Sequence, residues 1–397
     1  MTRNSGLMYL NLAHFFDHFF LLVFPTAVIA IESDWSLTYG EALALGTSMY
    51  VAFAIATLPA GWLGDHVDRR TLITVFFFGC GAASIATGLA TGGLSLAIGM
   101  AFLGAFTAIY HPVGMALVIE LAERPGRSLA VNGVFGNMGL AGSALVTGLL
   151  TQQFGWRSAF IVPGLISVAI GLTYGWQNLR SKTIGREGQQ KTQETFAQID
   201  RTAQMRVFAI VIVSAIFGGA VFNAVTITLP KLFDERLLFS GIDLSQVGGY
   251  AALVFAVAAF AQLPVGDLLD RYGARPILIG LLIPQVATLA LIATLQGPMV
   301  VPTAMLLVLL MFAEVPITSW LLGHFVAPHW RARAFSVEYV LSLGLGALVV
   351  PLIAWGHRNG HGFSTQYLLL AACAGTVLVA ALFLPAWRNK SASRAAS

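Results

Sequence analysis

The stretch PAGWLGDHVDRR, residues 59–70, returns later in the chain as PVGDLLDRYGAR, residues 264–275. The two copies lie 205 residues apart, and the same offset carries Pro25 onto Pro230. Five positions match between the copies: Pro59 with Pro264, Gly61 with Gly266, Leu63 with Leu268, Asp65 with Asp270, and Arg70 with Arg275. Agreement at one offset over a long segment indicates that the chain consists of two parallel repeats.

The composition around these copies is that of a membrane protein. Of the 397 residues, 57% are hydrophobic and only 10% are charged, whereas soluble domains carry about 25% charged residues. Many stretches exceed the roughly 20 apolar residues that cross a bilayer as a helix. We predict twelve spans, at residues 7–31, 40–63, 71–91, 94–121, 128–151, 156–177, 207–232, 246–269, 276–296, 299–326, 333–356 and 364–386.

One long polar connection, residues 178–206, separates six predicted spans from six. The expected fold is therefore an all-α polytopic membrane protein whose twelve transmembrane helices form two pseudo-symmetric six-helix bundles. Residues 1–177 form the N-terminal bundle, 178–206 a cytoplasmic linker, and 207–397 the C-terminal bundle with a short cytoplasmic tail. A binding site is expected between such repeats near the middle of the membrane.

The basic residues predict the orientation. With both termini on the cytoplasmic side, all but four of the 22 Lys and Arg residues lie inside, as positive-inside topology requires. The four exceptions are Arg157, Lys231, Arg236 and Arg358. The positive net charge thus reflects topology, and no nucleic-acid partner is expected. We expect a multi-pass protein of a bacterial inner membrane.

Two helix starts are also marked in the sequence. Thr38 with Glu41, and Asp243 with Gln246, have the spacing of a capping residue and its partner three residues later. The pairs precede spans two and eight, and they are separated by the repeat offset of 205 residues. Both are predicted to be capping boxes.

The loop Gly61–Arg70 resembles the signature that the major facilitator superfamily carries between helices two and three. The second copy, from Asp270 to Arg275, is the closer match, and Phe154-Gly155-Trp156-Arg157 is similar to the family's junction between helices five and six. The resemblance covers essentially the whole chain. It implies a secondary transporter that works by alternating access.

Within that superfamily the chain resembles the fosmidomycin-resistance-type efflux branch. The likeness lies in a His followed by an acid in helix one (His14, Asp17), in Tyr110-His111-Pro112 of helix four, and in a glycine ladder in helix five. The resemblance implies export by antiport.

Three ionisable residues, His14, Asp17 and His18, share one face of the first span because they are spaced three and four residues apart. They lie roughly 10–17 Å along that span, near the hydrocarbon centre. A charge there costs about 2.5–3.5 kcal/mol on insertion scales, so each group needs a cavity or a partner. We interpret them as a proton relay or substrate contact; the alternative is a hydrogen-bonded network that only fixes packing.

Other polar residues are expected at similar depth. His111 precedes Pro112, which removes a helical hydrogen bond and should kink helix four. Glu314 is an intramembrane acid and hence a candidate site residue. Asn223, Asn137 and Gln262 offer neutral hydrogen bonds to a ligand, although such residues are more often contacts between helices. We therefore assign proton coupling or substrate binding to His14, Asp17, His18, His111, Glu314, Asn223 and Asn137.

A second set is assigned to gating. Asp65 and Asp270 end helices on the cytoplasmic side, where a carboxylate can meet the N-terminus of a helix in the other half. The helix near Arg333 is the expected mate of Asp65, and the helix near Ser128 that of Asp270. The gating set is Asp65, Arg69, Arg70, Asp270, Arg271, Arg275 and Glu338, of which Glu338 can belong to the gate or to the cavity.

Four glycines, Gly133, Gly136, Gly139 and Gly142, recur every three residues in helix five. Small residues on one face allow helices to approach closely. We expect tight packing here; the alternatives are a surface for rocking or a bias towards export.

The leading hypothesis is proton-coupled efflux of a small organic molecule, with uptake by symport as the alternative. A divalent metal transporter using His14, Asp17, His18 and His111 is a further alternative, because these are suitable ligand types. A receptor, a scaffold or a lipid enzyme has no motif in its favour, so no enzyme activity is expected. We expect no resident metal or cofactor. The expected partners are the substrate, protons and the bilayer, and the expected state is a monomer.

Overall fold

The computed structural model describes residues 3–123, 125–181, 201–237, 241–326, 334, 337–342 and 344–385. Within these ranges, twelve helical stretches are long and apolar enough to cross a membrane. They follow one another in the order that the sequence predicts. The all-α, twelve-span fold class is confirmed.

Several spans consist of consecutive helical segments. In the N half these are α1 (Arg3–Asp34), α2 (Tyr39–Leu45), α3 (Thr47–His66), α4 (Arg69–Gly88), α5 (Gly93–Thr107), the π-helix η1 (Tyr110–Gly114), α6 (Met115–Leu121), α7 (Pro125–Phe154) and α8 (Ser158–Ser181). In the C half they are α9 (Arg201–Val213), η2 (Ser214–Gly218), α10 (Gly219–Arg236), α11 (Leu244–Ala258), α12 (Gln262–Tyr272), α13 (Ala274–Thr294), α14 (Val300–Phe325), α16 (Gly346–Arg358) and α17 (Phe363–Ala381). The eleventh span runs over Val337–Arg358.

The predicted linker is partly inside these helices. Residues 178–181 belong to the end of α8 and residues 201–206 to the start of α9, while 182–200 lie outside the described residues. Arg124, Arg331, Arg333 and the tail from residue 386 also lie outside them.

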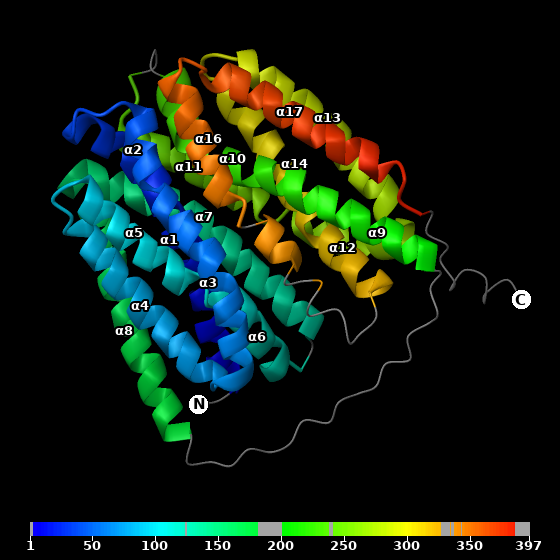
Figure 1. The fold of residues 1–397 in the computed structure, drawn as a ribbon, viewed down its shortest axis with the longest axis horizontal. Helices are drawn as coiled ribbons and strands as arrows, with labels where there is room; N and C mark the ends of the chain where they lie inside the picture. Colours follow the sequence, from blue (N-terminus) through cyan, green and yellow to red (C-terminus); the bar gives the residue numbers. More distant parts are fainter. Residues whose placement is uncertain are drawn as a thin grey trace, which may run out of the picture.

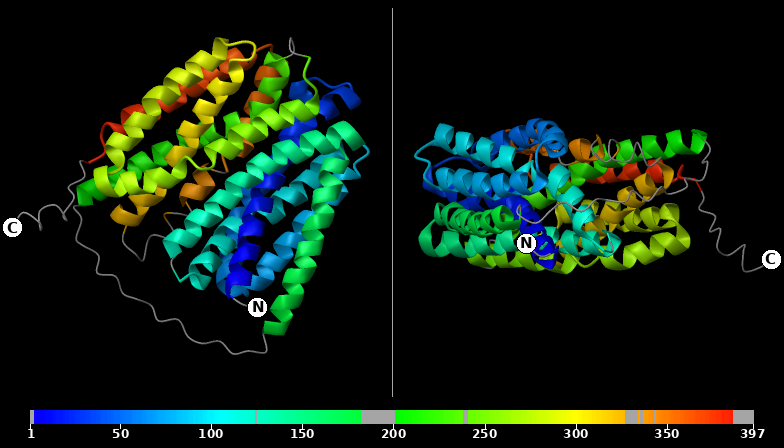
Figure 2. Two further views of the ribbon diagram at one scale, coloured as in Figure 1. Left: turned by 180° about the vertical axis from the view of Figure 1, so that it is seen from behind. Right: turned by 90° about the horizontal axis from the view of Figure 1, so that it is seen from below.

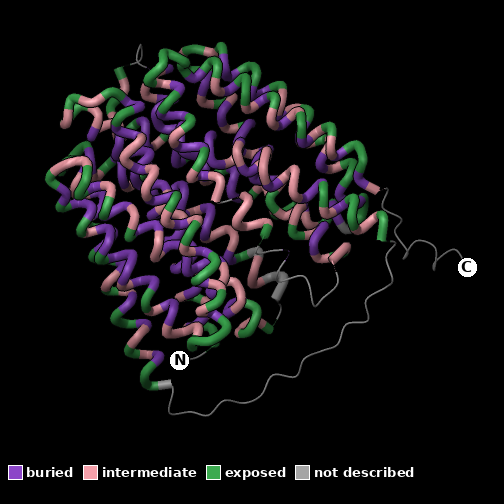
Figure 3. Tube along the Cα trace, viewed as in Figure 1, coloured by how far each residue is buried: buried purple, intermediate pink, exposed green. Residues whose placement is uncertain are grey.

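Large apolar side chains cover the outside of the bundle. Ile55, Leu58 and Trp62 of α3 are 69%, 62% and 61% exposed. Buried residues line the inward faces of the helices, and exposed residues follow the outer ones (Figure 3). A soluble protein rarely leaves so much apolar surface in water, so these faces are suited to lipid.

The two halves meet at one end of the molecule. We call this the far end; it carries Asp34, Arg236 and Arg358. The opposite, terminal end carries Arg3, Ser181 and Arg201. Contacts between the halves join α1 to α10, α2 and α3 to α16, and α7 to α11, while towards the terminal end the halves diverge (Figure 1; Figure 2).

An ion pair ties the halves together at the far end. Lys231 of α10 places Nζ 2.7 Å from Oε2 of Glu32 on α1, and 2.9 Å from Oδ2 of Asp234. The same ammonium lies 5.4 Å from the centre of the Tyr39 ring. Nearby, α7 and α11 approach closely where Gly148 faces Gly248. Lys231, an exception to the positive-inside count, therefore has a role in joining the halves.

Local structure follows the sequence signals. Thr38–Glu41 and Asp243–Gln246 each form the reciprocal bonds of a capping box, which confirms that prediction. Helix four is π-helical over Tyr110–Gly114, around Pro112. A proline lacks the backbone N–H that an α-helix uses, and a π-turn absorbs the defect. The regular α-helix is thus interrupted at Pro112, where the kink is expected, and the kink itself stays a prediction.

Candidate functional site

The first and fifth spans, α1 and α7, pack closely because α7 presents glycines to α1. A Cβ on Gly136 would lie 2.6 Å from Nε2 of His14, and one on Gly142 would lie 2.7 Å from the Phe15 ring. A Cβ on Gly139 would overlap the backbone carbonyl of Phe15. The expected tight packing is confirmed at these three positions. The fourth glycine, Gly133, instead lies beside Gln262 of the C half.

A buried carboxylate lies at the centre of the site. Asp17 is fully buried, and its Oδ2 lies 3.1 Å from Nε2 of His111 and 3.8 Å from Nε2 of His18. His111 projects from the π-helix η1, so the distortion in helix four brings this ring against α1. The structure thus brings together His14, Asp17, His18 and His111, four predicted site residues from two spans.

Asn132 of α7 fixes the orientation of His14. Nδ1 of His14 lies 2.8 Å from the backbone carbonyl of Asn132 and 2.9 Å from its side-chain oxygen. Both partners are acceptors, so Nδ1 carries the proton and donates. The Tyr110 hydroxyl donates to the same Asn132 oxygen at 2.8 Å, and the Asn132 amide donates to Leu10 and Asn11 of α1. His14 therefore turns Nε2 towards the cluster as an acceptor.

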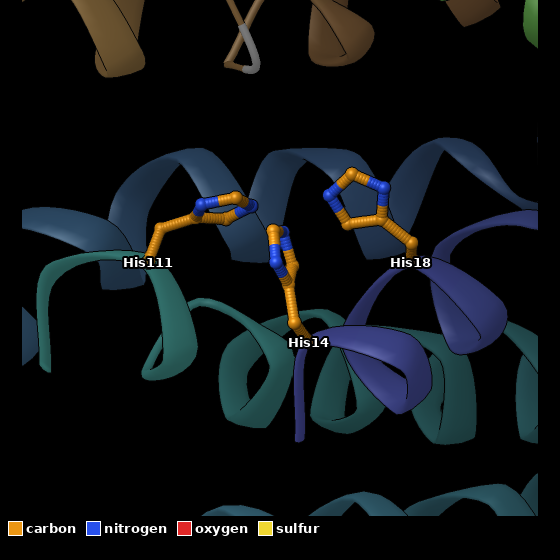
Figure 4. A group of neighbouring side chains, drawn as sticks. All are labelled: His14, His18 and His111. Atoms are coloured by element: carbon orange, nitrogen blue, oxygen red, sulfur yellow. The ribbon is translucent and has the colours of Figure 1, made fainter. Parts of the chain in front are cut away.

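The three imidazole rings point towards one another, with the ring of His14 between the other two (Figure 4). Their centroids lie 4.7–5.5 Å apart, and the Tyr110 ring stacks on His14 at 4.8 Å. Apart from the close approach of Asp17 Oδ2 to His111 Nε2, several buried polar atoms here have no hydrogen-bond partner: Nε2 of His14, Oδ1 of Asp17, Nδ1 of His18 and Nδ1 of His111. Burying polar atoms in this way is costly unless something pairs with them.

The C half reaches the cluster through Tyr339. Its ring centroid lies 5.4 Å from that of His111, with the planes tilted by 31°. Glu338 is the preceding residue, so the predicted gate or cavity acid lies on the helix that faces His111. The cluster is therefore positioned where a movement between the halves can reach it.

The other predicted binding residues lie elsewhere. Glu314 of α14 has a buried carboxylate oxygen without a hydrogen-bond partner, and no contact joins it to the cluster within the described residues. Asn137 is buried on α7, one turn beyond Gly133 and so on the side that faces Gln262. Asn223 donates to the carbonyls of Gly219 and Ser342, both at 2.8 Å, and joins α10 to the eleventh span.

Two of the predicted gating residues, Asp65 and Arg69, make contacts inside the N half. Arg69 lies 3.7 Å from Asp65 and 3.1 Å from Glu120, and also donates to the carbonyl of Gly64. Arg70 is partly buried, and Arg271 and Arg275 are exposed. The side chain of Asp270 and the helix start near Arg333 lie outside the described part of the structure. The pairing of Asp65 with the other half stays a prediction.

Sequence reasoning missed Asn132, Tyr339 and the joining role of Lys231. A signal for Asn132 was present, because it precedes Gly136 and Gly139 by four and seven residues and so shares their helix face. Tyr339 and Lys231 act across the contact between the halves. Sequence periodicity carries no information about that contact.

The arrangement suits proton exchange within the membrane. Asp17 and the three imidazoles lie close enough to pass a proton from one to another. A carboxylate at this depth is expensive as a free ion and needs a proton or a cationic partner. Nε2 of His111, 3.1 Å away, is the nearest group with which this carboxylate can share a proton.

Comparisons with known proteins agree with the fold and the motifs. The sequence profile of the Major Facilitator Superfamily matches residues 10–351. The chain is 26% identical over 379 residues to the D-galactonate transporter of Escherichia coli, covering 87% of this chain and 86% of that one. It is 25% identical over 414 residues to the gentisate transporter of Corynebacterium glutamicum, covering 91% and 85%.

A third relative, the probable 4-methylmuconolactone transporter of Cupriavidus pinatubonensis, is 25% identical over 275 residues, or 66% of this chain and 62% of that one. Among solved structures, the inward-open xylose transporter XylE from E. coli superimposes with a TM-score of 0.73 at 14% identity, covering 98% of each chain. An inward-facing bacterial homolog of the human lysosomal transporter Spinster gives 0.70 at 15% identity, covering 96% of each. At such identity the structures bear on the fold alone.

Proposed function

The chain belongs to the Major Facilitator Superfamily, and on that premise we propose that it carries a small organic molecule across the membrane by alternating access coupled to proton movement. As a member of this family it is a multi-pass transporter and not an enzyme. The coupling proposal is carried by one observation: the Asp17 carboxylate is fully buried in a membrane span, 3.1 Å from His111. Protonation there would change the affinity difference between the two states of the carrier, which coupling requires.

The contacts at the two ends support an alternating mechanism. We place both termini in the cytoplasm of a bacterial cell, in the inner membrane, with the chain acting as a monomer. The far end is then external and is closed by the Lys231–Glu32 pair. This state faces inward, and opening outward must break that pair while Asp65 and its neighbours engage the C half.

We propose export by antiport as the direction. Its support is the resemblance of His14, Asp17 and Tyr110-His111-Pro112 to the fosmidomycin-resistance-type efflux branch. Uptake by proton symport is the second candidate, because the D-galactonate and gentisate transporters are named for organic acids. An acid anion entering with a proton would meet the imidazoles of this cluster.

Reconstitution in liposomes that contain a pH-sensitive dye tests the proposal. Organic acids and uncharged or cationic drug-like solutes are added outside, and the lumenal pH is recorded beside solute uptake. Solute entry that makes the lumen more alkaline indicates antiport, and entry that makes it more acidic indicates symport. Solute uptake with no proton movement would contradict the coupling, and an absence of uptake for every organic class would contradict the transported substrate class.

A further inference from the structure

We propose that His14, His18 and His111 form a binding site for a divalent transition-metal ion, with the Asp17 carboxylate as the accompanying anion. The sequence alone assigned no resident metal to these residues. The proposal arises from their spatial arrangement, and it concerns binding, whatever the transported substrate is.

The three rings are spaced for one ion. One nitrogen from each of His14, His18 and His111 lies within 4.8 Å of the others. Two nitrogens that share a tetrahedral Zn²⁺, at bond lengths of about 2.0–2.1 Å, lie about 3.3 Å apart. The ligand nitrogens therefore need to approach one another by roughly 1 Å or a little more. Rotations about χ1 and χ2 of the histidines can provide this movement.

The surroundings of His14 match those of a metal ligand. Ligating histidines commonly donate the other ring N–H to a backbone carbonyl or a carboxylate, which fixes the tautomer and the ring plane. Nδ1 of His14 does this with the Asn132 carbonyl at 2.8 Å, and the Tyr110 ring stacks on the imidazole. The remaining nitrogen, Nε2, is buried and has no hydrogen-bond partner. His14 is thus oriented with its lone pair towards the other rings.

The other members also present unpaired atoms. Nδ1 of His18, Nδ1 of His111 and Oδ1 of Asp17 are buried without a hydrogen-bond partner, whereas Oδ2 of Asp17 and Nε2 of His111 face each other at 3.1 Å. A packing network would satisfy such atoms with one another, as Asn132 and Tyr110 do next to them. A bound cation pairs with several of them at once. The number of unpaired donor atoms in one place therefore favours a ligand over simple packing.

The donor set selects the class of ion. Imidazole ligands suit Zn²⁺, Co²⁺, Ni²⁺ and Cu²⁺, whereas Mg²⁺ and Ca²⁺ prefer sets of oxygen atoms. Asp17 contributes one negative charge, which reduces the charge that a divalent ion brings into the hydrocarbon region. Zn²⁺ and Co²⁺ are the expected ions, and Mg²⁺ is not expected to compete.

Cobalt titration of the purified full-length protein tests the site directly. Four-coordinate Co²⁺ with nitrogen ligands has a strong ligand-field band in visible light, and Zn²⁺ should displace the ion and remove the band. His18→Gln and His111→Gln are each expected to weaken Co²⁺ binding by at least about tenfold, because losing even an outer-shell partner of a ligand costs about 10–100-fold. His66→Gln is the control, because this exposed ring contacts the carbonyl and the ring of Trp62, one turn earlier in its own helix, and lies outside the cluster.

A wild-type protein without the band, or a band that survives both cluster variants, would overturn the proposal. If the variants do not fold, X-ray absorption at the zinc edge of the wild-type protein decides the question. Fewer than two imidazoles around bound zinc would then reject the site. These measurements need no transport activity, and transport in the presence of a chelator tests the proposed function separately. Movement of zinc into liposomes would support the site with the metal as cargo.

Discussion

The two halves of the molecule use the same helix contact for different chemistry. In the N half, α1 packs on α7, and His14 donates to the backbone carbonyl of Asn132. In the C half, the corresponding span α10 packs on the eleventh span, and Asn223 donates to the backbone carbonyl of Ser342. The pair of helices that the bond joins is retained between the repeats. Asn223 corresponds to His18 at the repeat offset, so the bond lies one turn further along the helix, and the residue types differ.

The ionisable groups are not retained. The residues 205 positions after His14, Asp17 and His18 are Gly219, Phe222 and Asn223. Phe222 stacks on Phe312, whose ring also stacks on Phe255, so the C half fills this region with aromatic packing. The repeat specifies how the helices pack. The proton chemistry proposed for His14, Asp17 and His18 has no ionisable counterpart at the matching positions of the C half.

The sharpest test of this difference is Asp17→Asn. The amide keeps the size of the side chain but cannot hold a negative charge, so pH-driven solute flux should fall by on the order of 100-fold. Flux in the liposomes is measured with an imposed pH gradient. Solute exchange without a gradient serves as the control and should persist. Full pH-driven flux in the variant would remove Asp17 from the coupling.

A smaller effect is expected from Asn132→Ala. The change removes the acceptor of the Tyr110 hydroxyl, whereas His14 keeps the backbone carbonyl. An unsatisfied buried group costs about 1–3 kcal/mol. Thermal unfolding should occur at lower temperature, and pH-driven flux should fall roughly tenfold. Asn359→Ala is the control, because Asn359 is exposed at the far end and donates to the carbonyl of Trp355 in its own helix. Equal losses in the two variants would argue that Asn132 has no special role.

The smallest effect is expected from Asn223→Ala. Asn223 is the C-half counterpart of His18 at the repeat offset. Hydrogen bonds between membrane helices contribute about 0.6 kcal/mol on average, so the unfolding temperature should decrease only slightly. The number of protons moved per solute should not change. A folded variant that has lost its proton coupling would show that the C half shares in the chemistry, and the comparison between the halves would fail.

Much of the fold follows from local signals in the chain. Span number, the capping boxes at Thr38 and Asp243, and the distortion at Pro112 are consequences of composition and of backbone chemistry within a few residues. The helix-one face of His14, Asp17 and His18 was likewise predictable, because spacing alone places them together.

The contacts between spans were harder to predict from the sequence. The 3.1 Å approach of His111 to Asp17 depends on how far the π-helix rotates helix four against α1. Helix five offers both Asn132 and Asn137 at similar depth, and the register of α1 on α7 decides which one meets His14. The pairing of Lys231 with Glu32 depends on the relative position of the halves, which local sequence does not encode.

The glycines of α7 have a consequence for genetics. Even alanine at Gly136 or Gly139 would push against the His14 ring or the backbone beside it. A random screen for loss of transport should therefore return these glycines as often as the ionisable residues. The damaging substitutions would then map to the contact between α1 and α7. The residue type in the wild-type chain, ionisable or glycine, would be needed to tell the transport residues from the packing residues.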